Sequence, residues 1–196
     1  MSVIGPRAEV TLTKALSLAP GHALAHYFLG RIKVHTNRAN QGIAECERAL
    51  ALDRNLAGAH YLIGTAKYFL GRAEETEAHV NEALRLSPRD TSAHIWTAFA
   101  GVAKLVLSSD EESLSLLSRS MEINRNYANA HFWLAAALAH LGRLSEARVA
   151  AQVGLVLNPD FTISRARSRA PSGNPVYMTQ RERVFDGMRK AGVPEG

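Results

Sequence analysis

The sequence has one cysteine, no long apolar run and no sign of a leader. Because Cys46 is the only cysteine among 196 residues, no internal disulfide can form, which fits a reducing compartment. The longest uninterrupted apolar run covers residues 132–139, whereas a membrane span takes about 20 residues. The segment from Met1 to Arg7 lacks the apolar stretch of a signal peptide. We therefore expect a cytoplasmic protein with no membrane partner.

Catalytic motifs are also lacking. There is no Gly-rich phosphate-binding loop, no G-x-S-x-G and no H-E-x-x-H. The acidic pair Glu74-Glu75 falls where a helix is expected to begin, and negative charge there suits the helix dipole. Cys46 shares a packing column with Val80, Leu117 and Ala151, so we expect a buried, inert thiol. The sequence predicts no enzyme activity and no cofactor.

What the sequence does contain is a short string that recurs at a fixed distance. Ala-His-aromatic begins at residues 25, 59 and 130, and an aliphatic variant begins at residue 93, giving steps of 34, 34 and 37 residues. A recurrence near 34 residues is typical of stacked helical hairpins. The longer third step is explained by a turn about three residues longer, residues 105–109, since insertions in such arrays fall in loops.

Small residues recur in register with this string. They fall where the two helices of a hairpin must approach closely, and larger apolar residues spaced by three or four surround them. Turn signals agree with this register: Gly71, Gly142 and Asn37 suit a positive φ. Ser109 and the acids after it predict a capping box. The small columns are Gly30, Gly64, Ala98, Ala135, then Gly42, Thr76, Ser113, Ala147, then Ala49, Ala83, Ser120, Gly154.

These columns, together with Leu29-Gly30 and Pro88, resemble the tetratricopeptide repeat, which has two antiparallel helices per unit. The resemblance covers residues 7–161 and departs from the family at the position that often holds Trp, which is His here. It implies an all-α fold, a right-handed α-solenoid with a C-terminal capping helix. The implied units are a half repeat (second helix only) at 1–22, repeats at 23–56, 57–90, 91–127 (with the lengthened turn) and 128–161, and a loop with the capping helix at 162–196.

Both ends of the array are distinctive. Residues 7–20 match a second helix whose first helix would precede residue 1, so we expect an arm of a longer array or an orphan helix that pairs with another chain. Near the other end, Asn174 and Pro175 predict the start of a helix that runs to about Ala191 and stops at Gly192. We expect that helix to cover the last apolar face of the array.

The matched histidines do not predict a metal site. Two zinc ligands lie within about 4 Å of each other, whereas equivalent points on packed helices are about 8–10 Å apart. Residues 26, 60, 94 and 131 therefore cannot converge on one ion, and the same holds for His35 and His140. We expect these imidazoles to be packing groups.

The family resemblance implies a binding groove along the concave face, which the first helices line. The family's carboxylate clamp requires Lys, Arg and Asn across three repeats, and only Arg31 is suitable, so an extended or helical apolar segment is the favoured ligand. Alternatively, about half of these residues are packing contacts, or another part of the protein covers them. The groove residues are Tyr27, Arg31, His35, Tyr61, Thr65, Tyr68, Phe69, Ile95, Phe99, Phe132 and His140.

A narrower resemblance concerns most of the chain. The run from Asn37 to Asn55, the joints at residues 87–90 and 124–127, and the ending from Gln180 to Glu195 resemble the C-terminal repeat region of bacterial class III adenylate/guanylate cyclases and related winged-helix regulators. This implies a regulatory or scaffolding arm that binds a protein or peptide, with any cyclase or DNA-binding chemistry in another domain.

Two alternatives stay open at this point. Residues 162–196 hold seven basic and three acidic residues, while residues 1–161 are near neutral, so the tail is a candidate phosphate- or nucleic-acid-binding segment. Nucleic acid is not favoured, because the tail lacks an obvious aromatic platform for stacking bases. The other alternative is a homodimer through residues 7–19.

Overall fold

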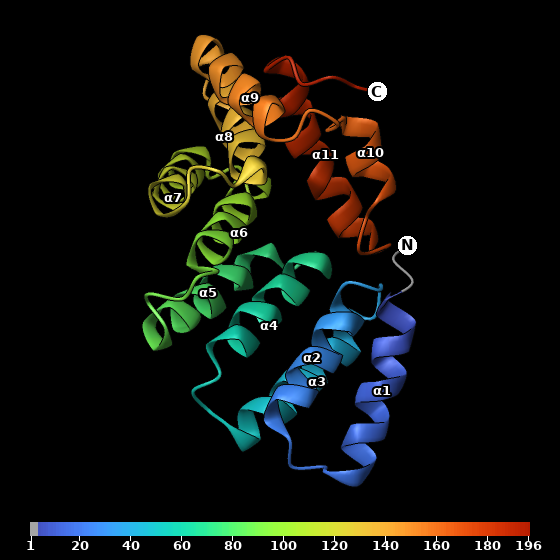
Figure 1. The fold of residues 1–196 in the computed structure, drawn as a ribbon. Helices are drawn as coiled ribbons and strands as arrows, with labels where there is room; N and C mark the ends of the chain where they lie inside the picture. The colour runs from blue at the N-terminus through green and yellow to red at the C-terminus, as the bar shows by residue number, and fades with distance from the viewer. Residues whose placement is uncertain (1–3) are drawn as a thin grey trace.

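The computed structural model describes residues 4–196, with side chains from Arg7 onward. This part of the chain consists of helices joined by short turns and contains no strand (Figure 1). The elements are α1 (Ile4–Leu18), α2 (Ala23–Val34), α3 (Ala39–Leu52), α4 (Ala57–Phe69), η1 (Ala73–Glu75), α5 (Thr76–Leu86), α6 (Ala93–Val106), α7 (Asp110–Ile123), α8 (Ala128–His140), α9 (Leu144–Leu157), α10 (Ile163–Ser168) and α11 (Pro175–Lys190).

The helices pair as consecutive antiparallel hairpins that stack in chain order. The hairpins are α2 with α3, α4 with α5, α6 with α7 and α8 with α9. Each second helix then packs against the first helix of the next hairpin, as α3 does against α4. This arrangement confirms the predicted all-α solenoid, in which each unit buries its apolar side against its neighbours.

The turns within the hairpins lie where the sequence predicts them. Asn37, Gly71 and Gly142 have φ values of 59°, 75° and 76°, as the turn signals require. The longer third turn places Ser108 at φ 64°. The capping-box prediction at Ser109 is wrong, because its side chain makes no capping hydrogen bond to α7. The acids that follow still lie in the first turn of α7, where they suit the helix dipole.

The small columns bring the helix backbones together. A Cβ atom on Gly30 would lie 2.9 Å from Cys46 Sγ and 3.0 Å from the carbonyl oxygen of Gly42, so no larger residue fits between α2 and α3. Cys46 and Ala49 are completely buried on the facing side of α3. The predicted contact of small residues inside each hairpin is confirmed in this hairpin.

Helix α11 begins and ends as predicted, but it packs on the first helices of the array instead of covering the last apolar face. The side-chain oxygen of Asn174 accepts hydrogen bonds from the backbone N–H groups of residues 176 and 177, and Gly192 ends the helix with φ 86°. The helix packs along α8 and α6 (Figure 1). It therefore caps the array from the side of the first helices, and Val149 and Val156 on the outer side of α9 stay exposed, contrary to the expected cover of the last apolar face.

Candidate peptide groove

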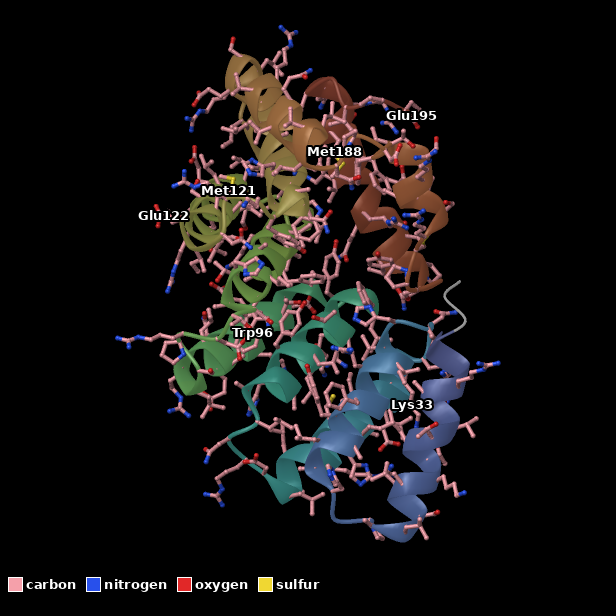
Figure 2. The ribbon with its side chains drawn as sticks, in the orientation of Figure 1. Lys33, Trp96, Met121, Glu122, Met188 and Glu195 are labelled. Atoms are coloured by element: carbon pink, nitrogen blue, oxygen red, sulfur yellow. The ribbon has the colours of Figure 1, made fainter. Side chains whose placement is uncertain are left out.

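The first helices of the hairpins, α2, α4, α6 and α8, form one side of the array. Figure 2 shows the array in the same orientation as Figure 1, with side chains filling the space between its upper part and α11. The predicted groove residues lie on these four helices and fall into three groups: residues that contact α11, residues packed between hairpins, and residues open to solvent.

The first group joins α4 to α11 through an aromatic cluster. The ring of Tyr177 on α11 lies 5.4 Å from the ring of Tyr68 and 5.5 Å from that of Phe69, edge to face in both cases. The cluster continues from Tyr68 to Phe99 at 6.2 Å and from Phe99 to Trp133 at 5.6 Å. Edge-to-face pairs at such distances stabilise packing beyond the apolar area they bury. Burial also raises the pKa of Tyr68 and of Tyr177.

Polar contacts fix α11 at its middle. His140 Nε2 donates a hydrogen bond to the carbonyl oxygen of Arg183 at 2.9 Å. The Arg183 guanidinium donates to the carbonyl oxygen of Leu105 at 3.0 Å and to Asp110 Oδ2 at 2.7 Å. Both partners of this ion pair are partly withdrawn from water, so its geometry matters more than that of a surface pair. In this part of the array α11 lies against the first helices. Tyr68, Phe69 and His140 contact this internal segment, and Phe99 is joined to it through Tyr68 and Phe69.

The second group lies between hairpins. Tyr27 packs on Gly58, where an added Cβ atom would lie 3.0 Å from the phenol oxygen. Tyr61 stacks on Trp96 with ring centroids 5.7 Å apart, and burial raises its pKa. Ile95 packs against the same cluster of buried residues.

Two more predicted groove residues are enclosed. Phe132 is completely buried and stacks on Phe161 at 3.9 Å. Thr65 is also buried, and its hydroxyl donates to the carbonyl oxygen of Tyr61 at 3.1 Å. Neither side chain reaches the surface, so the expectation that Phe132 and Thr65 line a groove is corrected. The residue directly after each matched histidine faces the neighbouring unit, which puts Tyr27, Tyr61, Ile95 and Phe132 between hairpins or against the segment after α9.

The third group is exposed and lies on α2 and at His35, the residue that caps its C-terminal end. Arg31 and His35 are both open to solvent, and the His35 ring lies 5.7 Å from that of Phe69. Two exposed apolar residues that the sequence-based set omits, Leu24 and Phe28, share their face of the helix, and the Arg31 guanidinium lies 5.3 Å from the Phe28 ring centroid. The spacing of 24, 28, 31 and 35 is the signal that could have found them. We call these four residues the α2 stripe.

Two histidines of the matched column bond to the joint that precedes their repeat. His26 Nε2 donates to the carbonyl oxygen of Pro20 at 3.0 Å, and His131 Nε2 donates to that of Arg125 at 2.8 Å. Each acceptor lies six residues earlier, in the joint that precedes the repeat. In the part of the chain that the structure describes, no three His, Cys, Asp or Glu side chains gather as a metal site requires.

A buried carboxylate on α3 contacts polar side chains of α2 that lie outside the α2 stripe. Glu45 on α3 is 4% exposed and accepts hydrogen bonds from Lys33 Nζ and from the His26 ring, both at 2.8 Å. Burial alone would raise the pKa of Glu45, but the hydrogen bonds from Lys33 and His26 hold it below its usual value. Next to it, burial and the charge of Glu45 raise the pKa of Cys46 to about 12, which matches the predicted inert thiol. The Glu45 network was not predicted from the sequence.

Most basic side chains of the C-terminal tail have partners inside the molecule. Arg167 pairs with Glu182 and Glu195, Arg189 also pairs with Glu195, and Lys190 pairs with Asp186. Arg181 is buried, and its guanidinium donates to the carbonyl oxygens of residues 166 and 167 and lies over the Phe185 ring. Together with Arg183, these pairs use five of the seven basic residues of the tail.

The geometry described so far is a solenoid of antiparallel helical hairpins, the fold that tetratricopeptide repeats form, and the comparisons agree on this fold. A family model described as "Tetratricopeptide repeat" matches residues 115–160. No curated protein matches the chain. Among residues 4–196, no helix has the length and apolar character needed to cross a membrane.

Solved structures share the fold over most of the chain. YrrB, described as a TPR protein with an unusual peptide-binding site, is 23% identical with a TM-score of 0.61, over 92% of this chain and 90% of that one. PilF from Pseudomonas aeruginosa is 21% identical with a TM-score of 0.69, over 95% and 87% of the two chains. PilW, a type IV pilus biogenesis factor, is 16% identical with a TM-score of 0.72, over 93% and 82%. TPR proteins generally mediate protein–protein interaction.

Proposed function

We propose that this protein is a non-catalytic, cytoplasmic scaffold that binds a partner protein or peptide through the α2 stripe and the adjoining edge of the aromatic cluster. The observation that carries the proposal is the contrast between the two parts of the concave side. Next to α6 and α8 that side is occupied by α11, while Leu24, Phe28, Arg31 and His35 on α2 are open to solvent. Exposed aromatic and arginine side chains side by side are the residue types that dominate binding energy at interfaces.

The way α11 binds indicates what kind of partner fits. It is an amphipathic helix that places Tyr177 against Tyr68 and Phe69 and leaves its polar side in water. The His35 ring packs edge to face with the Phe69 ring, so the α2 stripe adjoins the aromatic cluster. A partner segment with an aromatic or aliphatic anchor would lie along α2 next to this cluster. The peptide-binding site named for the similar structure YrrB fits this proposal.

We infer the biological context from the narrower resemblance. The run from Asn37 to Asn55 and the ending from Gln180 to Glu195 favour the regulatory or scaffolding C-terminal arm of a larger bacterial signalling protein, such as a class III nucleotide cyclase. Asn37 also has a structural task, since its side-chain oxygen accepts the backbone N–H of Gly173 at 2.9 Å and ties the α2–α3 turn to the loop before α11. A reading frame upstream that encodes neither a cyclase nor a winged-helix domain would contradict this context.

Self-association through α1 is a second candidate function, favoured by one observation. Val10 and Leu18 on this helix are 70% and 79% exposed, although both are large and apolar. A second copy that covers residues 7–19 would bury them. A molecular mass by light scattering that stays monomeric as the concentration rises would exclude this candidate. Nucleic-acid binding through the tail has less support, because six of its seven basic side chains have partners among residues 7–196.

Partner capture by the full chain tests the main proposal. Proteins retained from a lysate are quantified by mass spectrometry for the wild type, for a Phe28→Ala, Arg31→Ala double variant, and for Val149→Ala as a control on the exposed side of α9. All three changed side chains are solvent-exposed, and we expect the fold to be unaffected. The double variant should lose partners that the control retains. Equal capture by all three proteins would remove the α2 stripe as the binding surface.

A further inference from the structure

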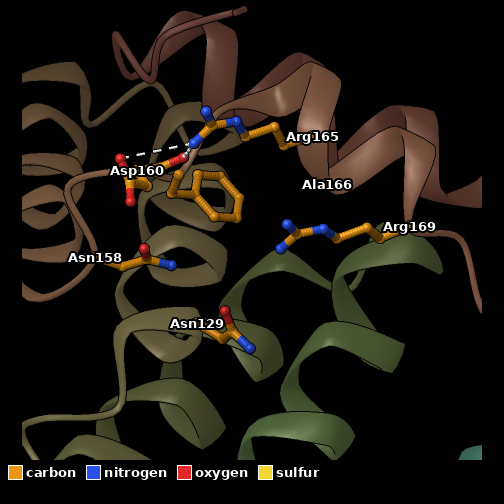
Figure 3. A pocket seen from close by; sticks show the side chains of 7 residues that line it. Asn129, Asn158, Asp160, Arg165, Ala166 and Arg169 are labelled. Atoms are coloured by element: carbon orange, nitrogen blue, oxygen red, sulfur yellow. Dashed lines mark hydrogen bonds and ion pairs between the residues drawn. The ribbon is translucent and has the colours of Figure 1, made fainter. Parts of the chain in front are cut away.

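A cavity of about 380 Å³ lies between the start of α8, the end of α9 and α10 (Figure 3). It belongs neither to the α2 stripe nor to the aromatic cluster. Its volume falls at the small end of the range for ligand sites, which suits one or two residues of a peptide rather than a whole helix. Its polar lining consists of Asn129, Asn158, Asp160, Arg165 and Arg169, and its apolar wall is Phe161.

Arg165 and Arg169 are the two arginines of the tail that line this cavity. Arg165 uses one nitrogen, Nη1, to donate to the backbone carbonyl oxygen of Asp160 at 2.7 Å. Its distance to Asp160 Oδ1 is 3.7 Å, an ion pair that solvent screens because the Asp160 side chain is 94% exposed, and this carboxylate offsets one of the two positive charges. For Arg169, no hydrogen bond or ion pair of the side chain is found within residues 7–196. The cavity therefore has spare N–H donors and a net positive charge.

The remaining wall is neutral and held in place. Figure 3 shows the Arg169 guanidinium pointing toward the side chains of Asn129 and Asn158. A carboxamide offers both a donor and an acceptor, which matches the N–H and C=O of a peptide group. The Phe161 ring is fixed by its stacking on the buried Phe132. This fixed ring gives the cavity one wall that needs no ordering on binding.

We propose that this cavity binds the carboxylate of an acidic residue in a partner peptide. The guanidinium groups of Arg165 and Arg169 receive the carboxylate, because their planar donors match its geometry. The carboxamides of Asn129 and Asn158 hold the adjoining peptide group. The inference rests on the proposed function in one respect, namely that the ligand is a peptide. It adds an acidic anchor at a distance from the α2 stripe.

Titration with small probes, followed by the backbone amide NMR signals of the full chain, tests the proposal. N-acetyl-aspartyl amide carries the carboxylate and two peptide groups, and N-acetyl-asparaginyl amide is its neutral isostere. Inorganic phosphate is the third probe. The variants are Arg169→Gln, Arg165→Gln and, as a matched control, Arg89→Gln, which removes an exposed guanidinium from the α5–α6 joint.

The aspartyl probe should shift the amides of Asn129, Phe161 and Arg169 with a saturating, millimolar curve. Each cavity variant should weaken this binding about tenfold, the effect of one lost charged hydrogen bond, and the control should not. Absence of saturable shifts at these amides, or equal binding of the neutral isostere, overturns the proposal. Tighter binding of phosphate than of the aspartyl probe overturns the peptide assignment. Because Phe28 and Arg31 are untouched, none of these results depends on partner capture by the α2 stripe.

Discussion

One added methyl group at Gly187 should loosen α11 from the array. A Cβ atom there would lie 2.7 Å from the carbonyl oxygen and 2.8 Å from the Cα atom of Ala136, whereas ordinary contact begins at 3.4 Å. These are backbone atoms of α8, so they cannot turn aside as a flexible side chain would. Overpacking of this kind costs about 1–3 kcal/mol. The higher helix propensity of Ala offsets at most about 1 kcal/mol of this overpacking cost.

We expect Gly187→Ala to weaken the docking of α11 by about 1–2 kcal/mol, which raises the undocked population by about five- to thirtyfold. Hydrogen exchange measures this directly, because the α11 amides exchange from the undocked state. The exchange of Phe185 and Met188 should accelerate by the same factor, while amides of α3 keep their protection. Gly21→Ala is the control, since no atom lies within 4 Å of its added Cβ. Unchanged α11 exchange in Gly187→Ala would refute the proposed close packing.

Three further predictions concern single side chains. Glu45→Gln should lower the free energy of unfolding at pH 7 by about 2 kcal/mol, because Lys33 and His26 lose a charged acceptor. Since the pKa of Glu45 is held below its usual value, the wild type should lose this stability as the pH falls below about 4.5, and urea titrations should show the two proteins converging in acid. Cys46, with a pKa of about 12, should not react with a thiol reagent at pH 8 until the chain is unfolded, and rapid labelling of the native protein would contradict its burial. Asn174→Ala should lower the melting temperature through the loss of about 1 kcal/mol of capping energy, and it should accelerate exchange in α11 only.

Local signals in the sequence predicted much of the fold. The positive φ values at Asn37, Gly71 and Gly142 and the cap at Asn174 depend on the residue itself and its near neighbours. The small columns repeat every 34 to 37 residues, so each copy supports the interpretation of the others. These features depend on backbone conformation and on packing between adjacent helices. The residue type at a single position indicates both.

The candidate site was harder to predict because its contacts are distant in sequence. Gln180 donates to the carbonyl oxygen of Gly71 across 109 residues, and no periodic pattern records such a contact. The aromatic residues that directly follow the matched histidines illustrate the same limit. Tyr61 and Phe132 have residue types suited to a groove, yet the neighbouring hairpin or the segment after α9 covers them. The periodicity identifies the face of the helix, but the tilt between hairpins decides which side chains on that face remain open.

Helix α11 changes how the array should lose its structure. A repeat array whose units contact only their neighbours unfolds progressively from its ends. Helix α11 contacts the aromatic side chains of α4 and packs on α6 and α8. It therefore connects three hairpins, each of which would otherwise contact mainly the hairpins next to it along the chain. Residues 57–190 should therefore melt as one cooperative block. The hairpin that carries the α2 stripe meets this block through α4 and through the contact of Asn37 with Gly173, and it should be the first to open.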